Sequence, residues 1–370
     1  MTPATDFLIM TTSTVQRSDF VLKPFMARSD AMAIRQILSV LVPYVALWLL
    51  AYELHDSLPW LLVPIAMLMV LFITRSFAMM HDCGHYSLFR RARVNRAVGF
   101  LLGVVNGLPQ YPWSRGHAYH HKHNGNWDRY RGPIAVRSVE QFDALSPFGQ
   151  RLYTMLRHPL MLFPGGLFYL IVRSRLQLLC GLLAYLPHLV GCLWRREWRG
   201  LFAYKSKFWY TTGEFWDLLL NNICVVGGWI LCGELMGHGF FWALYAPVMM
   251  CSAAIFICVF YVQHNFEESN AHRGEGWSYL DGALEGSSFL KLPPLLNWFT
   301  ADIGYHNVHH LCASIPNYHL AACHRANASL LTDVNVLHLQ DIPKCFGYIL
   351  WDAAHDRLTT VAEHRSTACP

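Results

Sequence analysis

The chain has 370 residues, of which 54% are hydrophobic and only 14% are Asp, Glu, Lys or Arg. Soluble domains carry roughly 25% charged residues, so this composition excludes a disordered chain, a coiled coil and a nucleic-acid-binding protein, and it argues against a soluble enzyme. The net charge of +5 is too small to indicate a partner by itself.

The first part of the chain is a polar tail followed by two apolar runs. Residues 1–34 are polar and lack the apolar core of a cleavable signal peptide. The runs 36–54 and 57–80 each provide close to the ~20 residues that cross a bilayer as a helix. Because only a short segment around Asp56 separates them, we expect a helical hairpin.

Two apolar segments follow in the middle of the chain. Residues 97–113 contain several glycines and prolines, and a single crossing there would separate two histidine clusters, so we expect an interfacial or re-entrant segment. Residues 158–194 either cross the membrane twice or lie in its interface. Two crossings would put Arg173 and Arg175 outside, against the positive-inside rule, so the interfacial placement is favoured.

A second hairpin is expected from the apolar runs 216–234 and 236–263. After it the chain turns polar, and we interpret residues 264–345 as a cytoplasmic cap and residues 346–370 as a C-terminal tail. Basic residues flank the hairpins but are absent from their tips, which places the tips outside and both termini in the cytoplasm. The expected fold is therefore an all-α integral membrane protein with four transmembrane helices in two hairpins, interfacial helices and a cytoplasmic histidine-rich cap.

The histidines form three clusters with helical spacing. There are 20 histidines against 24 acidic residues. Within each cluster the residues are three or four apart and share one face of a helix. A further histidine follows the last apolar run. The clusters and this histidine are His81 and His85; His117, His120 and His121; His306, His309 and His310; and His264.

This pattern indicates a metal centre on the cytoplasmic side. Imidazole is a good ligand for Fe, Zn, Cu and Ni, whereas the 11 cysteines are scattered singly and signal neither a thiolate site nor a disulfide framework. Nine imidazoles are too many for one metal ion and suit two irons with four or five ligands each. The alternative, polar helix ends at a membrane surface, does not explain three clusters with the same spacing.

The clusters resemble the H-x3-H, H-x2-HH and H-x2-HH boxes of the membrane fatty acid desaturases, and the resemblance covers about residues 35–345. It is closest to the bacterial acyl-lipid desaturases of the omega-6 (delta-12) type. Phe260 stands where the acyl-CoA branch has an Asn, which favours the acyl-lipid branch. The segments that carry the resemblance outside the first two boxes are 261–267, 284–288, 298–310, 315–318 and 323–326.

The resemblance implies an enzyme of the bacterial inner membrane that uses O2 and two non-haem irons, held by the nine histidines, to put a cis double bond into a fatty acyl chain, most simply that of a membrane lipid. Electrons would come from a ferredoxin or cytochrome b5-type donor with its reductase. Hydroxylases, acetylenases and ketolases share the same boxes and stay open as alternatives. A non-catalytic membrane haem or metal carrier would instead place single histidines at matched depths within the spans.

Four further residues are candidates for orienting the ligands. Metal-bound histidines usually donate their second ring N–H to an acceptor. Asp82, Glu285 and Asp302 could be such acceptors, although a carboxylate at a helix end can also be simply solvated. His123, two residues beyond the second cluster, is expected beside the metal centre or on the surface rather than among the ligands.

Overall fold

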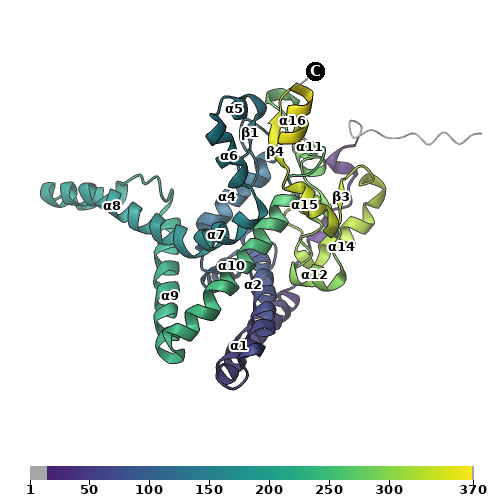
Figure 1. Ribbon diagram of the computed structural model, residues 1–370. Coiled ribbons are helices and arrows are strands. Elements are labelled where there is room, and N and C mark those ends of the chain that lie inside the picture. Colours follow the sequence, from purple (N-terminus) through teal and green to yellow (C-terminus); the bar gives the residue numbers. More distant parts are fainter. Residues whose placement is uncertain (1–14, 369–370) are drawn as a thin grey trace, which may run out of the picture.

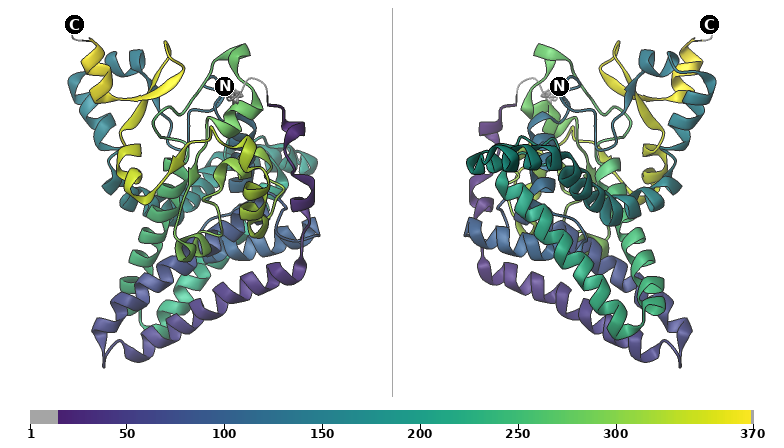
Figure 2. Two further views of the ribbon diagram at one scale, coloured as in Figure 1. Left: turned by 90° about the vertical axis from the view of Figure 1, so that its right-hand side faces the viewer. Right: turned by 90° about the vertical axis from the view of Figure 1, so that its left-hand side faces the viewer.

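The structure is a computed structural model that describes residues 15–368. Residues 1–14 of the expected N-terminal tail and residues 369–370 lie outside the described part. Most of the chain is helical, with two small sheets. Two pairs of long helices converge on a cap of shorter elements, where both ends of the described chain also lie (Figures 1 and 2). This confirms the all-α membrane fold class.

Two pairs of long helices form the predicted hairpins. They are α1 Asp30–Leu54 with α2 Leu62–Gly84, and α9 Thr212–Met236 with α10 His238–Val262. Each is long and apolar enough to cross a membrane. The side chains of Ser29 and Thr211 cap the first turns of α1 and α9 by accepting backbone N–H bonds.

The outward faces of the hairpins are apolar. On α1 the residues Leu38, Val42, Val45 and Leu49 follow helical spacing, and each is more than half exposed. Such a continuous apolar stripe is unfavourable in water but suits a hydrocarbon environment. Only α2 and α10, which pack against each other, bury about half of their span inside the protein.

A fifth segment, Pro159–Arg195, is also long and apolar enough to cross a membrane. It is continuous: α7 Leu162–Leu167 passes through a π-helical turn into α8 Arg173–Arg195. Figure 1 shows α8 turning aside from the top of α9 instead of running beside it. Arg175 fixes this turn, because its guanidinium donates to the carbonyl oxygens of Gly107 at 2.6 Å and Leu170 at 3.0 Å.

Short elements build the cap. The sheets pair β1 with β4 in parallel, β4 with β5 antiparallel, and β2 with β3 in parallel. The helices are α3 Ala92–Val105, α4 Gln110–His123, α5 Val139–Asp143, α6 Pro147–Met155, α11 Tyr279–Leu284, α12 Pro294–Phe299, α13 His306–Leu311, α14 Asn317–Ala326, α15 Ile342–Cys345 and α16 Val361–Ala368. The strands are β1 Arg137–Ser138, β2 Phe289–Leu290, β3 Val336–Leu337, β4 Tyr348–Asp352 and β5 Arg357–Thr360.

Both ends of the described part of the chain pack on the cap. On the N-terminal side, the Val21 backbone N–H and carbonyl both bond to the Asn327 side chain. On the C-terminal side, residues 346–368 form β4, β5 and α16, and the buried Trp351 stacks on Trp127 with ring centroids 4.3 Å apart. The apolar strand residues of this segment are buried against β1 and α6.

The contact between α7 and α10 depends on Gly166. A Cβ at this position would lie 2.6 Å from the Ala253 Cβ and 3.2 Å from the Ala254 backbone nitrogen. Only glycine lets the two backbones approach this closely. At the adjacent Gly165, by contrast, a Cβ would meet no atom within 4 Å.

We therefore expect Gly166→Ala to destabilise the protein by about 1–3 kcal/mol, the usual cost of an over-packed side chain. Thermal unfolding of the purified protein in detergent measures the change. Gly165→Ala is the matched control and should leave stability unchanged or slightly higher, because alanine favours a helix. Equal unfolding temperatures for the two variants would contradict the close contact.

Candidate metal centre

Four separate elements bring the nine histidines together. His81 lies in the last turn of α2 and His85 directly follows that helix; α4 carries the second cluster, His264 follows the end of α10, and α13 carries the third cluster. Seven of the nine are buried, while His85 and His117 are half-buried. The site therefore lies where the ends of two long helices meet two short helices of the cap.

The histidines divide into two groups in which the ligand nitrogens all lie within 4.8 Å of one another. The first group is His81, His85, His117, His121 and His309, and the second is His120, His264, His306 and His310. The division follows helix geometry. Successive residues of an α-helix differ by about 100°, so residues four apart share a group, whereas the neighbours His120 and His121 reach different ones.

The spacing of the nitrogens fits metal ligation. The Nε2 atom of His121 lies 3.0 Å from those of His117 and His309, and the Nε2 atom of His306 lies 2.9 Å from that of His264. Two nitrogens bound at right angles to a metal ion with bonds of about 2.1 Å lie about 3 Å apart. The buried Nε2 atoms of His81 and His85 have no hydrogen-bond partner within the described residues, as expected for atoms that bind a metal.

Burial favours the neutral form, which can bind a metal ion, in eight of these imidazoles: His85, His117, His120, His121, His264, His306, His309 and His310. Burial lowers the pKa of His264 to about 4, against a partly compensating hydrogen bond to the Gly286 carbonyl. Seven further clustered histidines outside the spans have a pKa well below the usual value. Burial is the largest cause and the nearby imidazoles are the second; the seven are His85, His117, His120, His121, His306, His309 and His310. At neutral pH their free lone pairs are therefore not lost to protonation.

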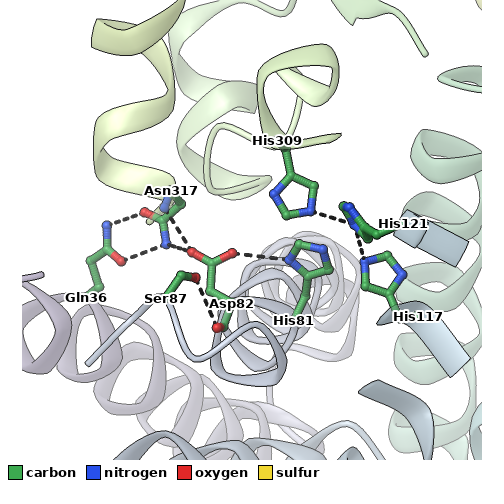
Figure 3. A network of polar contacts seen from close by, with 8 residues as sticks. All are labelled: Gln36, His81, Asp82, Ser87, His117, His121, His309 and Asn317. Atoms are coloured by element: carbon green, nitrogen blue, oxygen red, sulfur yellow. Dashed lines mark hydrogen bonds and ion pairs between the residues drawn. The ribbon is translucent and has the colours of Figure 1, made fainter. Parts of the chain in front are cut away.

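Asp82 orients the His81 imidazole and ties it to the cap, as Figure 3 shows. Its Oδ1 lies 3.2 Å from Nδ1 of His81, which puts the proton on Nδ1 and leaves Nε2 free. Its Oδ2 accepts hydrogen bonds from the backbone and side-chain nitrogens of Asn317, both at 2.9 Å. The Asn317 amide in turn exchanges hydrogen bonds with Gln36 of α1.

The other three candidates behave differently. Asp302 lies beside Arg75, and within the described residues its carboxylate makes no hydrogen bond to a clustered histidine. Glu285 accepts a hydrogen bond from the Asn270 side chain at 2.7 Å. His123 lies outside both groups and packs on Tyr119 at the end of α4, with ring centroids 4.4 Å apart.

Sequence reasoning missed three residues that support the histidines directly or through Asp82. The acceptor for His264 is a backbone carbonyl, that of Gly286, at 2.9 Å from Nδ1. Asn317 donates to Asp82, and Gln36 exchanges hydrogen bonds with Asn317; the two residues come from helices far apart in the chain. Asn317 lies within the segment 315–318 that carries part of the family resemblance, so the sequence contained a signal for its role. A backbone carbonyl such as that of Gly286 has no signal in the sequence.

An apolar cavity of about 930 Å³ opens onto the histidines. His117 of the first group and His120 of the second both line it. Phe260 lies at its inner end between the groups, with its ring centroid 5.9 Å from that of His117 and 5.6 Å from that of His306. A molecule in this cavity would be in contact with the edge of the metal centre.

Comparisons with known proteins point to one family. Residues 58–340 match the family model described as fatty acid desaturase. A fatty acid desaturase of Bacillus subtilis (strain 168) is 32% identical over 86% of this chain and 82% of its own length. An sn-1 acyl-lipid omega-3 desaturase (ferredoxin) of Nostoc sp. (strain 36) is 28% identical over 70% of this chain and 66% of its own length. A chloroplastic omega-3 fatty acid desaturase of Brassica napus is 28% identical over 69% of this chain and 58% of its own.

The Asp82 network predicts a selective loss of metal. Asp82→Asn replaces an acceptor oxygen by an NH2 group facing either His81 or the Asn317 donors, so we expect metal affinity to fall about 10- to 100-fold at the first histidine group. Metal ions per chain after dialysis, measured by mass spectrometry, report the change.

Asp302→Asn is the control, because Asp302 lies beside Arg75 and makes no hydrogen bond to the clustered histidines within the described residues. It should keep the metal content of the unmodified protein. Full metal retention in Asp82→Asn, or an equal loss in Asp302→Asn, would show that Asp82 does not orient a ligand.

Proposed function

The chain belongs to the fatty acid desaturase family, and from that premise we propose that it is a membrane oxidoreductase that uses O2 and a di-iron centre to introduce a cis double bond into a fatty acyl chain. The observation that carries the proposal is the division of nine imidazoles into groups of five and four at the inner end of an apolar cavity. A haem or metal carrier would have single histidines at matched depths within the spans. The clusters at the helix ends do not have that pattern.

Iron suits this set of ligands. Neutral imidazoles without thiolates favour a borderline metal ion, and groups of five and four leave coordination positions for O2. When bound, the two irons supply the O2 activation and hydrogen removal that an unactivated pair of methylenes requires. The overall change takes O2, two electrons and two protons, removes two hydrogens from the acyl chain and releases two waters.

The protein's own residues orient the histidine rings and enclose the space for the acyl chain. Asp82 and the Gly286 carbonyl fix ring orientation at His81 and His264. The aromatic residues Phe77, Phe256 and Phe260 line the cavity next to the histidines and exclude water from it. No side chain is required as a general acid or base in this proposal.

The substrate in the proposal is the acyl chain of a membrane lipid, and a ferredoxin or cytochrome b5-type protein with its reductase supplies the electrons. The Nostoc relative's name specifies both an acyl lipid and ferredoxin, which supports this choice. The proposed location is the bacterial inner membrane, and the distribution of basic residues supports an orientation with the site and both termini in the cytoplasm. Residues 158–194 then lie in the membrane interface, where α8 turns aside (Figure 1).

The first test is expression in a host that lacks the activity. We expect new cis-unsaturated acyl chains, whose double-bond position mass spectrometry of the lipids determines. Hydroxylated, acetylenic or keto products would select one of the alternative outcomes of the same site.

His309→Ala removes a ligand of the first group and should abolish the product and lower the bound iron, whereas His355→Ala, at an exposed histidine outside both groups, should change neither. An undiminished product from His309→Ala would refute the proposed centre.

Gly116 gives the second test, because its side of α4 faces the cavity. It lies next to His117 and one turn before His120, and a Cβ there would meet no atom within 4 Å. Glycine inside a helix costs up to about 1 kcal/mol relative to alanine, yet no neighbouring protein atom requires it here. The proposed acyl chain explains the empty space.

We expect Gly116→Leu to fill this space and reduce product from long acyl chains about 10- to 100-fold, consistent with an over-packing cost of about 1–3 kcal/mol. Bound iron should stay unchanged, which separates a blocked cavity from a damaged metal centre. Gly227→Leu is the control, because Gly227 also has open space around it but faces outward on α9. Undiminished product with Gly116→Leu would place the acyl chain elsewhere.

A further inference from the structure

The lining of the cavity is charged in one part and aromatic in another. Its charged residues are Arg115, Arg173, Lys207 and Glu214, and we call the part formed by the exposed Arg173 and Lys207 its mouth. The inner end is aromatic and reaches the histidines. One continuous space therefore joins a cationic mouth to the metal centre.

Arg115 and Glu214 neutralise each other. The Nε atom of Arg115 lies 2.8 Å from Oε1 of the buried Glu214, whose Oε2 accepts the Tyr210 backbone N–H at 2.8 Å. The guanidinium of Arg115 also packs over the Tyr210 ring, 3.8 Å from its centroid. This pair forms a fixed part of the wall rather than a free charge.

Arg173 and Lys207 are exposed and make no ion pair with a described acidic side chain. Their nearby contacts are aromatic, with the Arg173 guanidinium 5.1 Å from the Tyr169 ring centroid and the Lys207 ammonium 5.3 Å from that of Phe208. The mouth thus has two positive charges without a protein counter-ion. Two such cations beside an apolar cavity match an anionic group attached to an apolar chain.

The mouth is built from tied segments. Gln177 of α8 donates to the Phe208 carbonyl oxygen, which holds the Lys207-bearing loop against α8 close to Arg173. Within the loop, the buried Ser206 hydroxyl accepts the Phe208 backbone N–H at 3.0 Å. These bonds hold the chain segment that carries Lys207 next to the helix that carries Arg173.

The position of α8 decides which anion reaches this mouth. Its residues Leu176, Leu179, Leu183, Leu186 and Val190 form an exposed apolar stripe with helical spacing, and Leu176 also lines the cavity. A helix that turns aside from the spans with such a stripe lies at a lipid surface. The anion at that depth is the phosphate of a lipid headgroup.

We propose that Arg173 and Lys207 bind the phosphate of a glycerophospholipid, so that the acyl chain enters the cavity while still esterified to the lipid. The proposal rests on the proposed desaturase function for its acyl substrate and adds the site that selects the carrier. Other amphiphiles with anionic heads, such as an acyl-CoA or a free fatty acid, share part of this chemistry and are distinguished by experiment.

Photo-crosslinking tests the site without requiring catalysis. The probe is a phosphatidylglycerol with a diazirine midway along one acyl chain, mixed with the purified full-length protein in detergent and irradiated. Mass spectrometry then quantifies cross-links to the cavity residues of α4 and α10. The double variant Arg173→Gln/Lys207→Gln should lower the cross-link yield at least tenfold.

Two comparisons make the result specific. Arg196→Gln/Arg199→Gln removes the same charge from exposed positions outside the cavity and should leave the yield unchanged. A diazirine diacylglycerol, which lacks the phosphate, should cross-link equally to the unmodified protein and to the Arg173/Lys207 variant. An equal loss in the two double variants, or an equal loss with the uncharged probe, would overturn the phosphate site.

Diazirine palmitoyl-CoA and diazirine palmitic acid decide the source of the anion. If either of these probes, and not the phospholipid, shows the charge-dependent cross-link, the carrier assignment is wrong. Phospholipid cross-linking that depends on both cations, in a protein that forms no unsaturated product, would overturn the proposed function and leave the phosphate site standing.

Discussion

The structure depends on bringing neutral imidazoles from four separate elements to one buried place. At this place no described protein group forms a hydrogen bond to the buried Nε2 atoms of His81 and His85, and burying such unpaired polar atoms costs free energy. The surrounding contacts hold the arrangement against this cost. The packing of α2 on α10 sets the two helix ends side by side, and the Asp82–Asn317 bonds attach the end of α2 to the cap.

The same helices that hold the histidines also build the cavity. On α4 a single stripe contains Trp113, Gly116, His117 and His120, all of which line the cavity. Part of the cavity lining and three of the nine proposed ligands therefore belong to one helix. A displacement of α4 would change the geometry of the centre and the width of the cavity together. Residues on a helix hold both more precisely than residues on loops would.

The sequence predicted the local features well, because they depend only on helical spacing. The hairpin helices follow from apolar length, and the internal geometry of each histidine cluster follows from residues three and four apart. Asp82 was predictable because it is adjacent to His81. Asp302 shows the limit of this reasoning. It lies four residues before His306, which in a continuous helix would put the two side chains on one face. The backbone at Ala301 and Asp302 is left-handed instead, and the Asp302 carboxylate interacts with Arg75.

By itself the sequence determined the family, the membrane character and the identity of the histidine clusters. Only the tertiary structure decided that His309 joins His121, 188 residues earlier, that Gln36 and Asn317 support Asp82, and that Trp351 brings the C-terminal segment onto Trp127. The reason is physical. Spacing along one helix fixes which side chains share a face, but contacts between distant segments depend on how whole helices pack, and no local pattern records that packing.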